Sequence, residues 1–221
     1  MNRASSLTAV ALASALALAG CGTGGEQNTD AASETTSSTA AATGAGSPSS
    51  TPSGATSGEP IAEEHNDDDV MFAQMMIPHH QQAVDMSETL LAKDDIPADV
   101  QDFAQKVIDA QGPEIERMNQ MLQTWEAPMS GEDSTSMDHG AGGMMSEEDM
   151  GMLTDAQGTD AARLYLEQMT VHHEGAVEMA QEQIEQGQNP QAVELARQVV
   201  EDQEAEITEM EQMLQALPDG S

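Results

Sequence analysis

Paired histidines set among methionines are the residues of this chain best suited to chemistry. They occur between Phe72 and Met86 and again between Tyr165 and Met179, 93 positions later (79 to 172). The residues common to both copies are Met76, His79, His80, Ala83, Val84 and Met86, which recur as Met169, His172, His173, Ala176, Val177 and Met179. Imidazole and thioether groups, in a chain with a single cysteine, favour a soft cation, with Cu(I) and Ag(I) first.

Other metal chemistries and catalysis fit the sequence less well. A ferritin-type di-iron site needs Glu-x-x-His pairs, but the residues three before His79 and His172 are Met76 and Met169. The histidine spacings of zinc enzymes are absent, as are phosphate-binding loops and nucleophile motifs. The formal net charge of −34 repels nucleic acid. We therefore expect a binding protein and not an enzyme.

The elements that position the histidines are predicted to be helices. At 100° per residue, one stripe contains Phe72, Met76, His79, Ala83, Met86 and Leu90. This pattern predicts a helix that starts near Asp67, with a kink at Pro78. After a short turn at Pro97, a second stripe extends from Val100 to Trp125. The second copy predicts helices over 159–186 and 190–217.

The two helical hairpins are predicted to form an all-α domain over residues 65–217. Repeat one covers 67–125 and repeat two covers 159–217, and the connection over 126–158 is too polar and too glycine-rich to be a core element. Two hairpins with short turns and one long connection predict the ferritin-like variant of the four-helix bundle. An up-down-up-down bundle is the alternative topology.

Packing of the repeats about a pseudo-two-fold axis would bring His79 and His172 together near the centre. His80 and His173, about 100° away on their helices, should lie at helix–helix interfaces or face solvent. Within the first hairpin His79 should face Gln111, and a hydrogen bond between them would leave one ring nitrogen free for metal. The alternative is a pair of core His–Gln contacts with no ligand.

The methionines are unevenly distributed. Most helical methionines lie in the halves of the hairpins away from the short turns, which predicts a methionine-rich end of the bundle. Any one of them could simply fill the core. Core filling does not explain methionines in the connection over 126–158, which is predicted to be solvated. Its Met137, His139, Met144 and Met145 are predicted to form a secondary metal site, which is weaker because the chain must become ordered to bind.

The N-terminus is typical of an export signal. Arg3 precedes an apolar stretch from Leu7 to Leu18, and Leu18-Ala-Gly-Cys21 resembles the lipobox of bacterial lipoproteins. This resemblance implies a signal peptide over residues 1–20 and lipid attachment at Cys21; an ordinary secretory signal is the alternative. Residues 21–64 are rich in Ser, Thr, Ala, Gly and Pro and are predicted to be a disordered tether.

The motif Met-Ile-x-His-His-x-x-Ala-x-x-Met, repeated and followed each time by Met-x-x-Met-Leu, resembles domain-of-unknown-function family 305. The family comprises exported bacterial proteins with paired histidines. Membership implies a ferritin-like fold and, as in some members, copper binding through methionine and histidine. Thr170 departs from the usual apolar residue at its position. The resulting candidates are His79, His80, His172, His173, Met76, Met86, Met169 and Met179, with Met118 and Met210 from the following helices.

The leading hypothesis is a lipid-anchored, extracytoplasmic protein that sequesters or delivers Cu(I) or Ag(I). A metal-free helical module that binds an unknown protein partner through its paired histidines is the alternative. A copper redox enzyme is a third, for which the sequence shows no substrate site. Exposed His80 and His173 would favour the interaction module, whereas converging histidine and methionine side chains would favour metal.

Overall fold

The computed structural model describes residues 60–129 and 141–218, and all the regular structure in these two ranges is helical. The long helices are α1 (Asp67–Leu91), α2 (Ala98–Thr124), α4 (Gly158–Gln186) and α5 (Pro190–Ala216). Between α2 and α4 lie a short 3-10 turn, η1 (Ala141–Gly143), and the helix α3 (Glu147–Asp155). The predicted signal peptide and most of the predicted tether lie outside the described residues.

The helix ends follow from local sequence. Asn66 and Asp69 form a capping box at the start of α1, and three acidic residues in its first turn complement the helix dipole. The turn between α1 and α2 contains Asp95 with a positive φ of 59°. Asn189 caps α5 directly before Pro190, the first residue of that helix. The sequence-derived hairpin bounds are therefore confirmed to within a residue or two. α1 continues through Pro78 as one helix.

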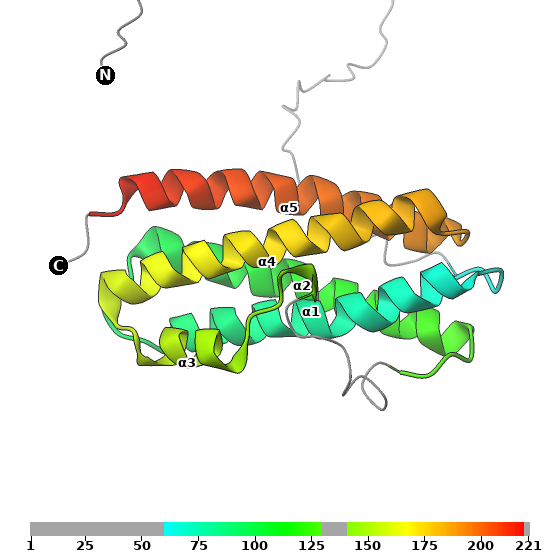
Figure 1. Ribbon diagram of the computed structural model, residues 1–221, viewed down its shortest axis with the longest axis horizontal. Helices are drawn as coiled ribbons and strands as arrows, with labels where there is room; N and C mark the ends of the chain where they lie inside the picture. Colours follow the sequence, from blue (N-terminus) through cyan, green and yellow to red (C-terminus); the bar gives the residue numbers. More distant parts are fainter. Residues whose placement is uncertain (1–59, 130–140, 219–221) are drawn as a thin grey trace, which may run out of the picture. The chain divides into compact units, whose positions relative to one another are not determined.

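The two hairpins pack antiparallel to each other (Figure 1). At one end, Ser87 near the end of α1 shares a hydrogen bond of 2.8 Å with Tyr165 near the start of α4. At the other end, buried Asp69 accepts hydrogen bonds from Gln183 and from the backbone of Asn189. Because α1 is antiparallel to both α2 and α4, the latter two are parallel. That order requires a long crossover and confirms the ferritin-like topology over the up-down-up-down alternative.

The connection between the hairpins contributes to the core, contrary to the prediction from its composition. Ser146 and Asp149 form a capping box that starts α3. Leu153 is fully buried, and Met145 and Met150 pack against the same core cluster. The polar and glycine-rich composition hid a nine-residue helix with a single apolar face.

The core forms two clusters, one toward each end of the bundle. One joins the turn end of the first hairpin, including Leu90 and Phe103, to the open end of the second, including Leu166 and Met210. The other joins Phe72 and Met118 to Leu195 and other residues at the turn end of the second hairpin. The prediction of a single methionine-rich end was wrong, because antiparallel packing places the open end of each hairpin beside the turn end of the other.

Candidate metal centre

His79 and His172 meet at the centre of the bundle. Their ring centroids are 3.7 Å apart with an interplanar angle of 37°, and both side chains are buried. Each lies on the apolar stripe of its helix, α1 or α4, and these stripes face each other across the pseudo-two-fold axis. The prediction that the repeat brings these two rings together is confirmed.

The second histidine of each pair is held by a carboxylate within its own hairpin. His80 Nε2 lies 2.7 Å from Glu114 Oε2, and His173 Nε2 lies 2.9 Å from Glu206 Oε2. Both imidazoles are fully buried, so the expected position at a helix–helix interface is confirmed and solvent exposure is excluded. The orienting role of these glutamates was not predicted, although Glu114 and Glu206 recur in the repeat at equivalent positions.

His79 is held by the connection and not by Gln111. Its Nε2 lies 2.7 Å from the carbonyl oxygen of Gly142. The side chain of Gln111 is buried, and neither of its polar atoms has a hydrogen-bond partner in the part of the chain that the structure describes. The predicted His–Gln pair is therefore wrong. The His79 ring lies against that of His172 on α4, and Glu114 of α2, three residues after Gln111, contacts His80.

These contacts leave metal-binding lone pairs free. A carbonyl or carboxylate can only accept, so Nε2 of His79, His80 and His173 carries the proton and donates it. In the neutral ring Nδ1 then holds an unshared lone pair. The buried Nδ1 atoms of all three rings, and both nitrogens of His172, have no partner within the described residues. Unsatisfied buried polar atoms cost about 1–3 kcal/mol each, and a soft cation would bind these lone pairs.

The environment keeps the central rings neutral, as a metal ligand must be. Burial, together with positive charge on the neighbouring His80, lowers the pKa of His79 to about 3. Burial also lowers the pKa of His172 well below its usual value, and a charged His79 adds to the effect. Protons therefore compete weakly with a metal at these two rings.

The methionine candidates divide between the two core clusters. Met76 and Met169 are fully buried one turn before His79 and His172. Met118 shares the cluster of Met76, while Met86 and Met210 share that of Met169. Met179 is partly exposed and packs against the cluster of Met76. The structure therefore brings the histidines into one layer and places buried methionines on both sides of it.

Part of the predicted secondary site lies in the described connection. Met144 and Met145 are half-buried, and the Met145 backbone exchanges two hydrogen bonds, of 2.9 and 2.7 Å, with the Gln82 side chain. The expectation of a solvated segment at these two methionines was therefore wrong. Met137 and His139 lie outside the described residues. Among the residues that are described, no group of three His, Cys, Asp or Glu side chains has metal-binding geometry. A central site would therefore combine the imidazoles with the thioethers of methionine.

Several solved structures resemble this chain. A fragment from Deinococcus radiodurans of the family DUF305 is 31% identical, with a TM-score of 0.64 over 72% of this chain and 100% of the other. A secreted DUF305 protein from Streptomyces coelicolor is 32% identical, with a TM-score of 0.62 over 70% and 96%. CopM in its Cu(I)-bound form is 31% identical, with a TM-score of 0.56 over 67% and 96%.

A comparison with curated proteins gives no match. The sequence does match the family described as "Domain of unknown function (DUF305)" over residues 69–214, which span both hairpins and the connection. The resemblance inferred from the paired-histidine motif is thereby confirmed, and this chain belongs to the DUF305 family.

Proposed function

We propose that this protein binds Cu(I) or Ag(I) at the central histidine layer and acts in the sequestration or delivery of the metal outside the cytoplasm. The observation that carries the proposal is the pair His79 and His172, whose rings lie 3.7 Å apart in a buried site. Metal–nitrogen bonds are about 2 Å long, so one ion can reach both rings. CopM, which shares this fold, has been solved in Cu(I)-, Cu(II)- and Ag-bound forms.

The residues of the layer have distinct roles in this proposal. His79 and His172 supply nitrogen ligands, and thioethers of the flanking Met76 and Met169 supply soft donors. Glu114 and Glu206 orient His80 and His173 through Nε2, the arrangement in which a carboxylate fixes a histidine for metal binding through its other nitrogen. A bound cation would balance the negative charge of Glu114 and Glu206 beside the layer. The sequence contains no phosphate-binding loop or nucleophile motif, and we propose binding without catalysis.

The protein interaction module is the second candidate, and the burial of the paired histidines argues against it. His80 and His173 have no exposed surface, so a partner protein could not contact them without opening the bundle.

We further propose that the protein is exported and anchored by lipid at Cys21. None of the described helices is both long enough and apolar enough to cross a membrane. The relative from Streptomyces coelicolor is described as a secreted protein, which supports the export signal predicted for this sequence.

Titration with Cu(I) under a competing chelator tests the central site. The chain used carries Cys21→Ser, so that its only thiol does not bind the metal. The double variant His79→Ala/His172→Ala should lose the tightest site, and each single variant should weaken it comparably. His65→Ala is the matched control, because His65 stacks on Trp125 at the surface, away from the layer. Unchanged Cu(I) affinity in the double variant would refute the proposal.

A further inference from the structure

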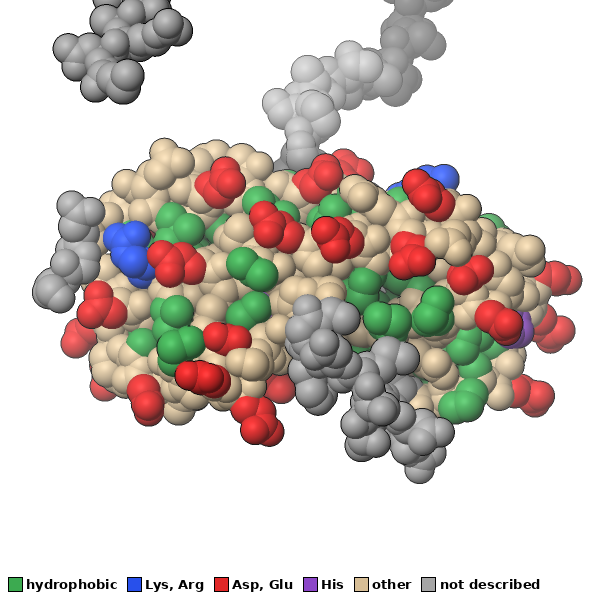
Figure 2. Space-filling view, viewed as in Figure 1, with side chains coloured by type: hydrophobic (Ala, Val, Ile, Leu, Met, Phe, Trp, Pro, Cys, Tyr) green, Lys and Arg blue, Asp and Glu red, His purple; other side chains and the backbone are tan. Residues whose placement is uncertain are grey.

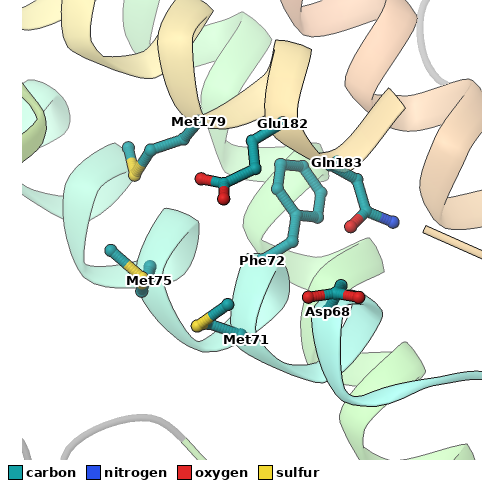
Figure 3. Close-up of a pocket in the computed structure, with 7 residues that line it drawn as sticks. All are labelled: Asp68, Met71, Phe72, Met75, Met179, Glu182 and Gln183. Atoms are coloured by element: carbon teal, nitrogen blue, oxygen red, sulfur yellow. The ribbon is translucent and has the colours of Figure 1, made fainter. Parts of the chain in front are cut away.

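A second group of methionines lines an open pocket between α1 and α4, away from the histidine layer. The pocket has a volume of about 40 Å³, and Phe72 is among its lining residues. Figure 3 shows Met75 and Met179 reaching into it from α1 and α4, Met71 at its rim, and the carboxylate of Glu182 beside Met179. Met71 is 42% exposed, and Met75 and Met179 are partly exposed, so all three side chains border solvent.

The pseudo-symmetric counterpart of this pocket is closed. A shift of 93 positions relates Met71, Met75 and Met179 to Leu164, Gln168 and Met86 (71 to 164, 75 to 168, 179 to 86). Met86 is fully buried, and Leu164 packs against the same core cluster, which includes Leu153 of α3. Gln168 donates a hydrogen bond of 3.0 Å to the backbone carbonyl of Asp149, also on α3. The fold therefore covers one of two equivalent surfaces and leaves open the one that carries three methionines.

Core filling does not account for thioethers at an open surface. Methionine in a core fills gaps, but Met71 and Met75 border solvent, whereas their repeat equivalents are a leucine and an amide. Acidic Asp68 and Glu182 line the same pocket and would raise the local concentration of cations. Sulfur ligands then select a soft ion from those that the carboxylates attract.

We propose that Met71, Met75 and Met179 form a surface site that captures one Cu(I) or Ag(I) ion and passes it to the histidine layer. The capture step stands on the pocket itself, whereas the transfer step rests on the proposed function of the layer. No covalent or redox change is involved, because the ion exchanges ligands in one oxidation state.

Met179 connects the pocket to the layer. A Cβ built on Gly142 would lie 3.4 Å from Met179 Sδ, so this sulfur packs against the glycine. The carbonyl oxygen of the same glycine is bonded to His79 Nε2. Only Gly142 therefore separates a cation held by Met179 from the imidazole of His79. A side chain at position 142 would fill the space between them.

The test uses Ag(I) and the full chain carrying Cys21→Ser, with the methionine methyl groups labelled with carbon-13 for NMR. Addition of Ag(I) should shift the methyl resonances of Met71, Met75 and Met179. The variant Met71→Leu/Met75→Leu should bind one Ag(I) fewer per chain and load the histidine layer at least tenfold more slowly. Met→Leu nearly conserves volume, so the bundle should fold. Met152→Leu is the matched control, since Met152 is 47% exposed on α3.

The outcomes separate the pocket from the layer. Unmoved resonances of Met71 and Met75, or an unchanged stoichiometry in their double variant, would overturn the capture site. A normal loading rate of the layer in that variant would overturn the transfer step. In the His79→Ala/His172→Ala variant the pocket resonances should still shift, because the pocket does not depend on the layer. A chain with both histidines intact whose pocket resonances shift but whose layer binds no Ag(I) would contradict only the proposed function.

Discussion

The four histidines of the repeat are held by different partners, and these partners determine what each ring can do. Glutamates fix His80 and His173, while a backbone carbonyl fixes His79. His172 has no hydrogen-bond partner at either nitrogen among the described residues. Either nitrogen of His172 is therefore available to a metal, and its ring lies against that of His79, whose Nδ1 also has no hydrogen-bond partner among the described residues.

Acid should destabilise the fold through the two central histidines. Their pKa values are lowered by burial, that of His79 to about 3. Below the usual histidine pKa of about 6.5 the unfolded chain binds protons that the native state rejects, so stability is complete above that pH and falls as the pH drops toward 3. The free energy of unfolding should fall by roughly 1.4 kcal/mol per pH unit for each histidine. Urea unfolding between pH 7.5 and 4.5 measures this slope.

The variant His79→Gln/His172→Gln is the control for that slope, because glutamine does not titrate. Protonation of the many surface carboxylates affects both proteins alike and cancels in the comparison. The variant should be less sensitive to acid by about two protons. Equal slopes in the two proteins would show that the central rings are protonated in the native state.

At the residue level, prediction from the sequence succeeded where helical periodicity alone places a side chain. It failed where the contact depends on the rotation of a neighbouring helix or on backbone far away in the sequence. The helical stripe was sufficient to place His79 opposite His172. It could not show that Glu114 contacts His80 while Gln111 lacks a hydrogen-bond partner among the described residues, because these two residues of α2 are less than one turn apart. The contact between His79 and Gly142 joins residues that are 63 positions apart, and no local pattern reports such a contact.

At the scale of elements, the connection between the hairpins binds both repeats near the pseudo-two-fold axis. Gln82 of α1 holds the backbone of Met145, and Gly175, its equivalent in α4 (82 to 175), receives η1 in close contact. The same position of the repeat thus contacts the connection in both hairpins. In α1 the amide of Gln82 forms hydrogen bonds with it, and in α4 the lack of a side chain at Gly175 lets its backbone come close. In Figure 1 this segment crosses the middle of the bundle beside α4.

Gly175→Ala should displace the connection. A Cβ at Gly175 would overlap the carbonyl group of Gly142 and approach Gly143 N to 2.6 Å. The added methyl group meets backbone, which cannot move aside as a flexible side chain would. Overpacking of this kind costs about 1–3 kcal/mol, and the hydrogen bond from His79 to Gly142 should also be lost. Urea unfolding measures the cost, and the His79 ring resonances report the hydrogen bond.

Gly112→Ala is the matched control for this prediction. Gly112 also lies within a helix, α2, but a Cβ there would have nothing within 4 Å. Alanine should stabilise that helix by about 0.5–1 kcal/mol. A Gly175→Ala protein as stable as the wild type, with an unchanged His79 environment, would show that the connection does not depend on this close approach.

The elements themselves were largely predictable, and the exception has a physical reason. Four long amphipathic helices with short turns follow from the periodicity, with side-chain caps at the starts of α1 and α5, and their bounds agree with the sequence. α3 was missed because its nine residues include Gly151 and bury only Leu153. Its capping box, Ser146 with Asp149, is nevertheless a start signal that can be read from sequence.

At the scale of the whole molecule, the antiparallel order of the hairpins explains both the successful and the failed predictions. It places the middle of each repeat on the axis, which is why the histidines meet. It also sends the methionine-rich open ends in opposite directions, which the repeat alone could not show. On the face that Figure 2 shows, acidic residues are spread over all the elements in view, with few basic side chains among them. Such a surface attracts cations and repels anionic lipid headgroups.

This charge distribution makes the proposed anchor testable. A formal net charge of −34 cannot hold the domain at an anionic membrane by electrostatics, and the described helices offer no span. Under the proposal, membrane attachment depends on Cys21, which lies outside the described residues. One acyl chain gives only marginal binding, so stable attachment requires the several chains that lipoprotein processing adds.

The wild-type protein should remain in the membrane fraction after a high-salt wash and should incorporate labelled fatty acid. Cys21→Ser should lose the label and leave the membrane fraction while still folding. A Cys21→Ser protein recovered in the membrane as firmly as the wild type would show that lipid at this residue is not the anchor.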